Sequence, residues 1–370
     1  MYGRLAGALL IPLTLLLDFH AARAAVTQAW PPFVLVAGLL LIGRVAGNDR
    51  LFDVAASRMV RLPGPPVVLA IACFALVAVV TALLNLDTAA VFLTPVLVKT
   101  ARRRGTAVGP FLYGAIFMAN GSSLFLPGSN LTNLLVLSGG HVSGASFFVH
   151  MLPVALAATV VTAVGLLVIH RRGLLGGGGS SGEPESEPEI ALRLGIGFWG
   201  ALLAACLIVA LHNAALPVLA VGLILLAWRA YGKELAWGES LSWLDVPTLA
   251  GLFGLAVALG TLARASAFPA DVLHSPGSVA TATIAALASV TVNNLPAAVL
   301  LSSGAHLPMR ALLLGLNVGP NLAVTGSLAV LLWWRAARLV GERPSAIAYS
   351  LQGLVLVPLV LASALALSIL

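Results

Sequence analysis

The chain has 370 residues, of which 60% are hydrophobic and only 9% are charged, and its mean hydropathy is +1.04. Soluble domains carry about 25% charged residues, so this composition excludes an ordinary soluble protein and indicates a membrane protein of several helices. The net charge of +7 does not indicate a nucleic acid partner, because the basic residues lie at the ends of apolar segments, where the positive-inside rule places them.

The first 25 residues allow two interpretations. Arg4, the apolar run Leu5–Leu17 and the small residues "AARAA" at Ala21–Ala25 fit either an uncleaved first membrane helix or a cleaved secretory signal. Both give the next helix the same orientation. We therefore predict a multi-pass protein of the plasma (inner) membrane with a cytoplasmic N-terminus.

Apolar segments recur along the chain at the length that a membrane helix requires, roughly 17–25 residues. The clearest are Val67–Leu84, Met151–Ile169, Leu194–Leu211 and Leu351–Leu370. We expect these helices to pack into one bundle within the lipid bilayer.

One polar segment divides the chain. "RRGLLGGGGSSGEPESEPE", Arg171–Glu189, combines a glycine run with four glutamates and two prolines, a composition that cannot build a core. We predict a cytoplasmic linker at 171–190 between an N-terminal half, 1–170, and a C-terminal half, 191–370. The glycine run lacks the Lys–Ser/Thr ending of a phosphate-binding loop, so the chain itself does not encode an ATPase.

The basic residues predict two segments that enter the membrane and return on the same side. With a cytoplasmic N-terminus, all of the 20 Lys and Arg residues except Arg23, Arg264 and Arg310 lie inside, provided that two segments do not cross. These segments are a cytoplasmic-side re-entrant hairpin at about 67–100 and an outer-side re-entrant hairpin at about 278–304.

The tips of the two hairpins are similar in sequence. "NLDTAAV" (Asn85–Val91) aligns without gaps on "NNLPAAV" (Asn293–Val299). Each hairpin is followed by a long apolar segment that is interrupted by small and polar residues, at about 111–139 and about 311–334. An odd number of crossings separates the copies, so the repeat is inverted. We predict an all-α polytopic membrane protein, an inverted-repeat secondary transporter with two re-entrant hairpins and two broken helices, because such breaks survive in lipid only around a cavity or ligand.

Five segments carry a resemblance to a known family. They are "LIGRVAGNDRLFDVAASRM" (Leu41–Met59), "NLDTAAVFLTPVL" (Asn85–Leu97), "LPGSNLTNLLV" (Leu126–Val136), "SVTVNNLPAAVLL" (Ser289–Leu301) and "GLNVGPNLAVTGSLAVLLWWR" (Gly315–Arg335). The chain resembles the ion transporter superfamily, and within it the arsenite efflux permeases and the permeases of the divalent anion/sodium symporter type. The resemblance implies a fixed scaffold, a transport unit made of both hairpins and both broken helices, and coupling to an ion gradient. Arsenite permeases commonly carry Gly-Asn-Pro-Thr-Asn where this chain reads "GSNLTN" (Gly128–Asn133).

Asp87 is the acidic residue that this topology places deep in the membrane, whereas the other 12 of 13 lie in loops, at interfaces or in the linker. An intramembrane carboxylate is costly and indicates function. Low polarity favours its neutral, protonated form, which suits a proton carrier. Two alternatives are a structural N-cap of the second hairpin arm and a cation ligand.

Amide and hydroxyl side chains at the tips and breaks are the remaining candidates for substrate or ion binding. Exposed helix ends attract polar and anionic groups, and glycine permits the non-helical turns. The alternative is that these side chains only satisfy nearby backbone groups. The candidates are Asn85, Asp87, Thr88, Gly128, Ser129, Asn130, Thr132, Asn133, Asn293, Asn294, Asn317, Thr325, Gly326 and Ser327.

This inferred site contains no Arg or Lys, which favours a proton-coupled efflux permease for an uncharged oxyacid such as arsenous or antimonous acid. The alternatives are a sodium- or proton-coupled anion or dicarboxylate permease, and a sodium/proton antiporter of the same superfamily. Paired inverted breaks argue against a channel. Cys73 and Cys206 lie apart in apolar segments and predict neither a disulfide nor a metal site. No cofactor and no enzymatic activity are expected, and the sequence leaves open a homodimer and an associated ATPase subunit.

Overall fold

The structure, a computed structural model, describes residues 14, 18–138, 142–175, 195–232, 246–265, 277–302 and 307–369. Within these ranges every regular element is a helix. Most of the predicted first helix or signal and of the predicted linker lies outside the described residues.

The first half contains the first predicted hairpin and broken helix. Its elements are α2 (Phe19–Asn48), α3 (Leu51–Val60), α4 (Pro66–Leu83), α5 (Leu86–Thr88), η1 (Ala89–Leu93), α6 (Thr94–Arg103), α7 (Gly109–Ser122), η2 (Pro127–Ser129), α8 (Leu131–Leu137), α9 (Gly144–Ile169) and α10 (Arg171–Leu175). The elements α5, η1 and α6 follow one another without a break, and η1 is a π-helix.

The second half repeats this order after two additional helices. Its elements are α11 (Ile196–Ala210), α12 (Ala215–Tyr231), α14 (Val246–Ala265), α16 (Ser278–Val292), α17 (Asn294–Ser302), α18 (Met309–Val318), η3 (Gly319–Leu322), α19 (Leu328–Leu339) and α20 (Ala346–Ile369). Among the described helices, five are long and apolar enough to cross a membrane, namely α2, α4, α9, α14 and α20.

Both predicted hairpin tips are points where the backbone leaves the helical conformation. Asn85 is extended, with φ −171° and ψ 171°, and its Oδ1 accepts from the Thr88 backbone N–H at 2.7 Å. Asn293 has φ +77° and ψ 149°, a conformation that is rare for any residue other than glycine. Each asparagine therefore ends one helix and begins the next.

The two hairpins enter the bundle from opposite ends. The Arg104 guanidinium, just after α6, donates to the carbonyls of Val60 and Leu62 just before α4, at 2.8 and 2.7 Å, so both arms of the first hairpin open at one end. Arg102 also pairs with Glu342 at 2.5 Å, at the connection to α20. The far part of α20, with Leu365, lines a groove with Val279 at the start of α16, so the second hairpin opens at the other end.

The first hairpin is shorter than the bundle. At 1.5 Å per residue, α4 is about 27 Å long, whereas the 26-residue α9 is about 39 Å long. The tip after Leu83 therefore lies within the bundle. That the hairpins are re-entrant in the bilayer stays a prediction, because α4 alone has the length of a membrane crossing.

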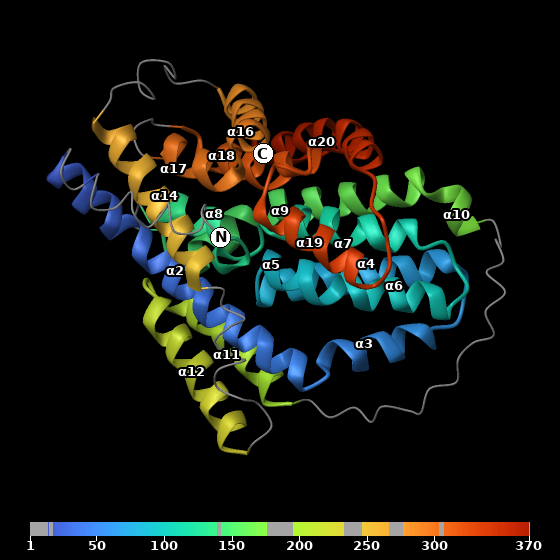
Figure 1. Ribbon diagram of the computed structural model, residues 1–370. Coiled ribbons are helices and arrows are strands. Elements are labelled where there is room, and N and C mark those ends of the chain that lie inside the picture. Colours follow the sequence, from blue (N-terminus) through green and yellow to red (C-terminus); the bar gives the residue numbers. More distant parts are fainter. Residues whose placement is uncertain are drawn as a thin grey trace.

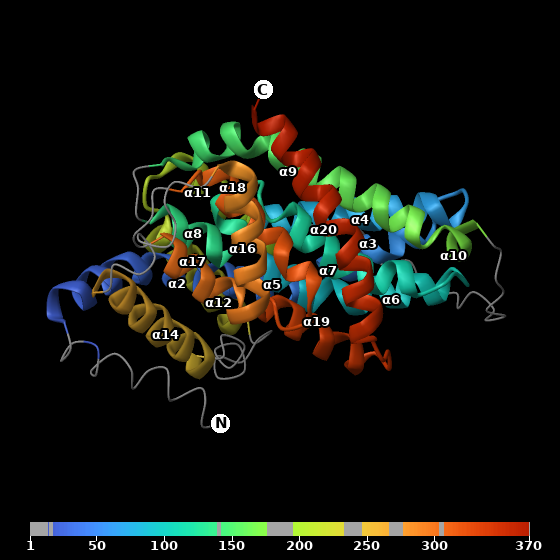
Figure 2. The same ribbon diagram turned by 90° about the horizontal axis from the view of Figure 1, so that it is seen from above.

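The helices form two groups that lie side by side (Figures 1 and 2). In the first, which we call the scaffold group, α2 packs against α11, α12 and α14. The second, the core group, contains both hairpins and both broken helices together with α9 and α20. Asp49, at the end of α2, pairs with Arg229 of α12 and accepts from the Gly197 backbone N–H at 2.7 Å. The ion pair and this hydrogen bond together link three helices of the scaffold group, α2, α12 and α11.

Candidate functional site

Both hairpin tips meet the starts of α8 and α19, the helices that follow the two breaks, at a cavity of about 250 Å³. Its polar lining comes from the two halves of the chain alike. The polar residues are Asp87, Asn130 and Thr132 from the first half and Asn293, Asn294 and Ser327 from the second. All six were predicted from the sequence, and the structure brings them together although more than 200 residues separate Asp87 from Asn293.

Four helices begin at this cavity, and each has a side-chain cap or turn at its N-terminal end. Asn85 caps α5, and the Asn130 Oδ1 accepts from the Thr132 N–H at 3.2 Å at the start of α8. The Asn293 Oδ1 accepts from the Leu295 N–H at 3.3 Å at the start of α17, and the Ser327 Oγ accepts from the Val330 N–H at 3.3 Å at the start of α19. The first residues of all four helices line the cavity. The positive ends of four helix dipoles therefore converge on one space.

Asp87 is the one charged side chain that the described lining contains. It is the second residue of α5 and is partly exposed. No described residue forms a hydrogen bond or an ion pair with its carboxylate. The cap of this helix is Asn85, so the alternative in which Asp87 serves as the N-cap is not what the structure shows.

Several predicted residues lie behind the cavity wall. Asn85 and Thr88 are buried, and the Asn85 Nδ2, the Thr88 Oγ1 and the Thr132 Oγ1 have no hydrogen-bond partner among the described residues. Buried polar atoms without partners are uncommon in native proteins. Polar capacity at the first hairpin tip and at the start of α8 is therefore left for a ligand, an ion or water.

Other predicted residues have structural contacts instead. Gly128 lies against Ile208 and Leu39 of the scaffold group, so close that a Cβ atom would stand 2.7 Å from Ile208. Ser129 holds the break at η2 by accepting from the Leu126 N–H at 3.2 Å. The carbonyls of Thr325 and Gly326 accept from Asn293 Nδ2 and the Asn294 N–H, at 3.1 and 2.9 Å. The breaks are therefore shaped by four predicted residues that do not line the cavity, namely Gly128, Ser129, Thr325 and Gly326.

Asn133 and Asn317 also lie outside the lining. They hydrogen-bond to each other across the two halves, with the Asn317 Nδ2 donating to the Asn133 Oδ1 at 2.8 Å. The sequence did not distinguish them from Asn130, because all three are asparagines at a helix break. It also missed Leu252 and Leu255 of α14, which form an apolar part of the wall and carry no polar signal.

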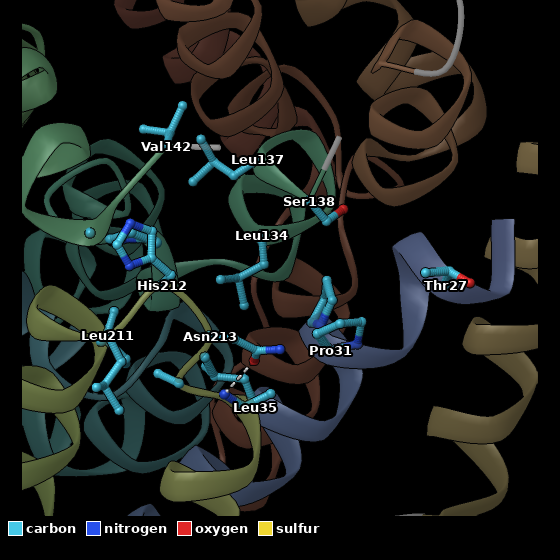
Figure 3. A pocket seen from close by; sticks show the side chains of 16 residues that line it. Thr27, Pro31, Leu35, Leu134, Leu137, Ser138, Val142, Leu211, His212 and Asn213 are labelled. Atoms are coloured by element: carbon cyan, nitrogen blue, oxygen red, sulfur yellow. Dashed lines mark hydrogen bonds between the residues drawn. The ribbon is translucent and has the colours of Figure 1, made fainter. Parts of the chain in front are cut away.

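A second cavity of about 210 Å³ lies between the scaffold group, at α2 and the connection from α11 to α12, and the core group, at the end of α8 and the start of α9. Figure 3 shows Pro31 and Thr27 of α2 on one side and His212 and Asn213, between α11 and α12, on another. None of the predicted site residues lines it. The convergent helix ends therefore make the 250 Å³ cavity the candidate site.

Comparison with known proteins agrees with this geometry. The sequence profile of a family described as "Citrate transporter" matches residues 3–333. The chain belongs to the citrate transporter family. No curated protein matches it.

As a member of the citrate transporter family, the chain is a multi-pass secondary transporter. Among solved structures it is similar to the Alcanivorax borkumensis YdaH transporter, whose structure is described as having an unusual topology, with a TM-score of 0.61 over 96% of this chain and 88% of that chain. The two are 14% identical, so this likeness concerns the fold alone. The prediction of an all-helical secondary transporter of the ion transporter superfamily is confirmed.

Proposed function

We propose that this protein is a proton-coupled transporter of a small organic anion, such as a carboxylate of the citrate class. The observation that carries the proposal is the convergence of four helix N-termini on the cavity beside Asp87. Unpaired N–H groups and the helix dipole make such ends favourable for an anion. They supply a positive potential where the described lining contains no Lys or Arg.

In this proposal the substrate is bound by the polar lining of the cavity. Asn130, Thr132, Asn293, Asn294 and Ser327 supply amide and hydroxyl donors and acceptors. Asn85 and Thr88 lie at the first hairpin tip, behind the cavity wall, and each has one hydrogen-bonding atom without a partner among the described residues. A ligand or a coupling ion at the tip would satisfy these atoms. The family's name, citrate transporter, supports a carboxylate substrate.

Asp87 couples the anion to the proton by electrostatics. At about 6 Å and an effective dielectric constant of about 20, two negative charges repel by roughly 3 kcal/mol. Protonation of Asp87 removes this repulsion and leaves a hydrogen-bond donor. Proton and anion therefore bind more tightly together than separately, which is the thermodynamic basis of symport.

The sequence hypothesis of arsenous or antimonous acid efflux is the second candidate, and the lack of Lys and Arg in the described lining favours it. Arsenous acid and antimonous acid are uncharged, and their O–H groups are hydrogen-bond donors. The ionised Asp87 carboxylate would accept hydrogen bonds from them. In this case proton and substrate compete for the same carboxylate. The expected process is then proton/substrate antiport.

The sign of the pH dependence distinguishes the two candidates. We expect the purified protein to bind citrate more tightly as the pH falls, because Asp87 becomes protonated; arsenous acid would instead bind more weakly. Asp87→Asn is the control, since its remaining pH dependence comes from the substrate alone. Equilibrium binding measures the affinity for each substrate as a function of pH, and flux in vesicles measures transport driven by a pH gradient.

Three results would contradict the anion proposal. One is binding of arsenous acid without binding of citrate or other small carboxylates. Another is a citrate affinity whose pH dependence is the same in wild type and Asp87→Asn. The third is carboxylate uptake that follows a sodium gradient and ignores a pH gradient, which would assign the coupling to sodium.

A further inference from the structure

The two broken helices cross at a cluster of buried amides and hydroxyls behind the candidate cavity, and Asn130 is the member of this cluster that lines the cavity. Asn120 of α7 and Asn317 of α18 occupy equivalent positions in the two repeats. Asn120 precedes the cap residue Asn130 by the same spacing as Asn317 precedes the cap residue Ser327. Both side chains are fully buried, yet their partners differ.

Asn317 uses all of its hydrogen-bonding capacity. Its Oδ1 accepts from the Asn130 Nδ2 at 2.7 Å and from the Ser123 Oγ at 2.6 Å, and it shares the single proton of this hydroxyl with the Asn120 carbonyl, 2.8 Å from the same Oγ. Its Nδ2 donates to the Asn133 Oδ1 at 2.8 Å and to the Leu313 carbonyl at 2.7 Å. An amide offers two acceptor sites and two donors, so this side chain is fully satisfied, mainly by the other half of the protein.

Two of these partners fix the start of α8. Asn130 lines the cavity and caps α8 through its Oδ1, while Asn317 holds its Nδ2. Asn133 lies one turn further and donates to the Ser123 carbonyl at 2.7 Å. The seven-residue α8 is too short to be stable without packing, so external contacts must orient it.

The equivalent Asn120 makes a different contact. Its Nδ2 donates to the Asn321 Oδ1 at 2.7 Å, and Asn321 also accepts from the Tyr349 hydroxyl at 3.4 Å. Neither Asn120 nor Asn321 lines the cavity or bonds to a residue that does. This pair is therefore a cross-half hydrogen bond of similar burial that leaves the site untouched.

We propose that Asn317 is a positioning residue for the substrate site: from the second half, it orients the cap and first turn of α8 and so shapes the first-half wall of the cavity. The statement that this cavity binds the substrate rests on the proposed function. The statement that Asn317 orients α8 does not depend on which ligand binds. Loss of the Asn317 amide frees Asn130 to rotate and turns the helix end away from the bound anion.

The test compares Asn317→Leu with the matched control Asn321→Leu. Both remove a buried cross-half amide and put a side chain of similar size in its place. We expect citrate affinity to fall about tenfold or more in Asn317→Leu, equivalent to ~1.4 kcal/mol, and to stay within about twofold in Asn321→Leu. Thermal unfolding in detergent, measured alongside, should show a similar loss of stability in both. Equal loss of affinity in the two variants would overturn the inference.

Asn317→Ala provides a second variant if the leucine substitution prevents folding. It removes the same amide without adding bulk or a charge near the anion, so citrate affinity should again fall about tenfold or more. A stable Asn317→Ala variant that binds citrate as tightly as wild type would contradict the role assigned to the Asn130 contact.

Hydrogen exchange separates this inference from the proposed function. In the absence of substrate, the backbone amides of residues 131–137 should exchange faster in Asn317→Leu than in wild type or Asn321→Leu. If wild type does not bind citrate, the proposed function fails while this measurement still tests Asn317. Unchanged exchange in α8 would refute the positioning role.

Discussion

At the scale of single residues, the proposed proton coupling rests on Asp87. Asp87→Asn keeps the size and much of the hydrogen-bonding capacity of the side chain but cannot take up or release a proton. We expect substrate binding to persist and flux driven by a pH gradient to be lost. Binding and flux should be measured on the same purified variant in vesicles.

Asp53→Asn is the control for this prediction, because Asp53 is an exposed carboxylate on α3, outside the cavity. It should transport as wild type does. Near-normal gradient-driven flux in Asp87→Asn would end the proton-carrier proposal. Loss of binding together with flux would indicate a cation ligand instead.

At the scale of helices, α16 packs so closely against α18 and the start of η3 that only glycine fits at the contact. A Cβ atom on Gly315 would overlap the Ala282 carbonyl, and one on Gly319 would stand 2.5 Å from the Ala286 Cα. Small residues four positions apart let membrane helices approach one another. The second hairpin therefore lies directly against the second broken helix.

Gly315→Val should separate these two helices. Overpacking costs about 1–3 kcal/mol, so we expect a lower unfolding temperature in detergent and weaker substrate binding, because α16 and α18 both lead to the cavity. Gly277→Ala is the matched control, since no atom lies within 4 Å of the added Cβ position. Equal unfolding temperatures for Gly315→Val and wild type would show that the helices can separate without loss.

At the scale of the whole molecule, several arginines gather at one end of the bundle. The end at which the first hairpin opens carries Arg102, Arg104 and Arg343. The other end carries the connection between α11 and α12, where Gly144 at the start of α9 lies against Ile208. We infer from the positive-inside rule that the arginine-rich end is cytoplasmic.

Cysteine labelling tests this orientation. In a Cys206→Ser background, which removes the exposed native cysteine and keeps the buried Cys73, we expect Asn213→Cys to react with a membrane-impermeant thiol reagent in intact cells. Arg343→Cys should react only after the membrane is opened. The reverse pattern would invert the proposed topology, and labelling of both in intact cells would contradict opposite placement.

The sequence alone determined the class of protein, the positions of both hairpin tips and both helix breaks, and six polar residues of the cavity. Hydropathy and the clusters of proline, glycine and asparagine at the breaks are local signals, because these residues lower the helix propensity of the segment that contains them. The superfamily resemblance rested on those same segments. Arsenite as substrate, by contrast, remains a proposal beside the organic anion.

Only the tertiary structure decided which of several similar side chains lines the candidate cavity. Asn130 and Asn317 have the same chemistry, yet Asn130 lines the cavity and Asn317 accepts a hydrogen bond from Asn130 behind it. Asn85 takes the cap and leaves Asp87 free of hydrogen bonds from described residues. These roles depend on how each short helix is rotated about its axis, and that rotation is fixed by packing between halves almost 200 residues apart, which no local pattern encodes.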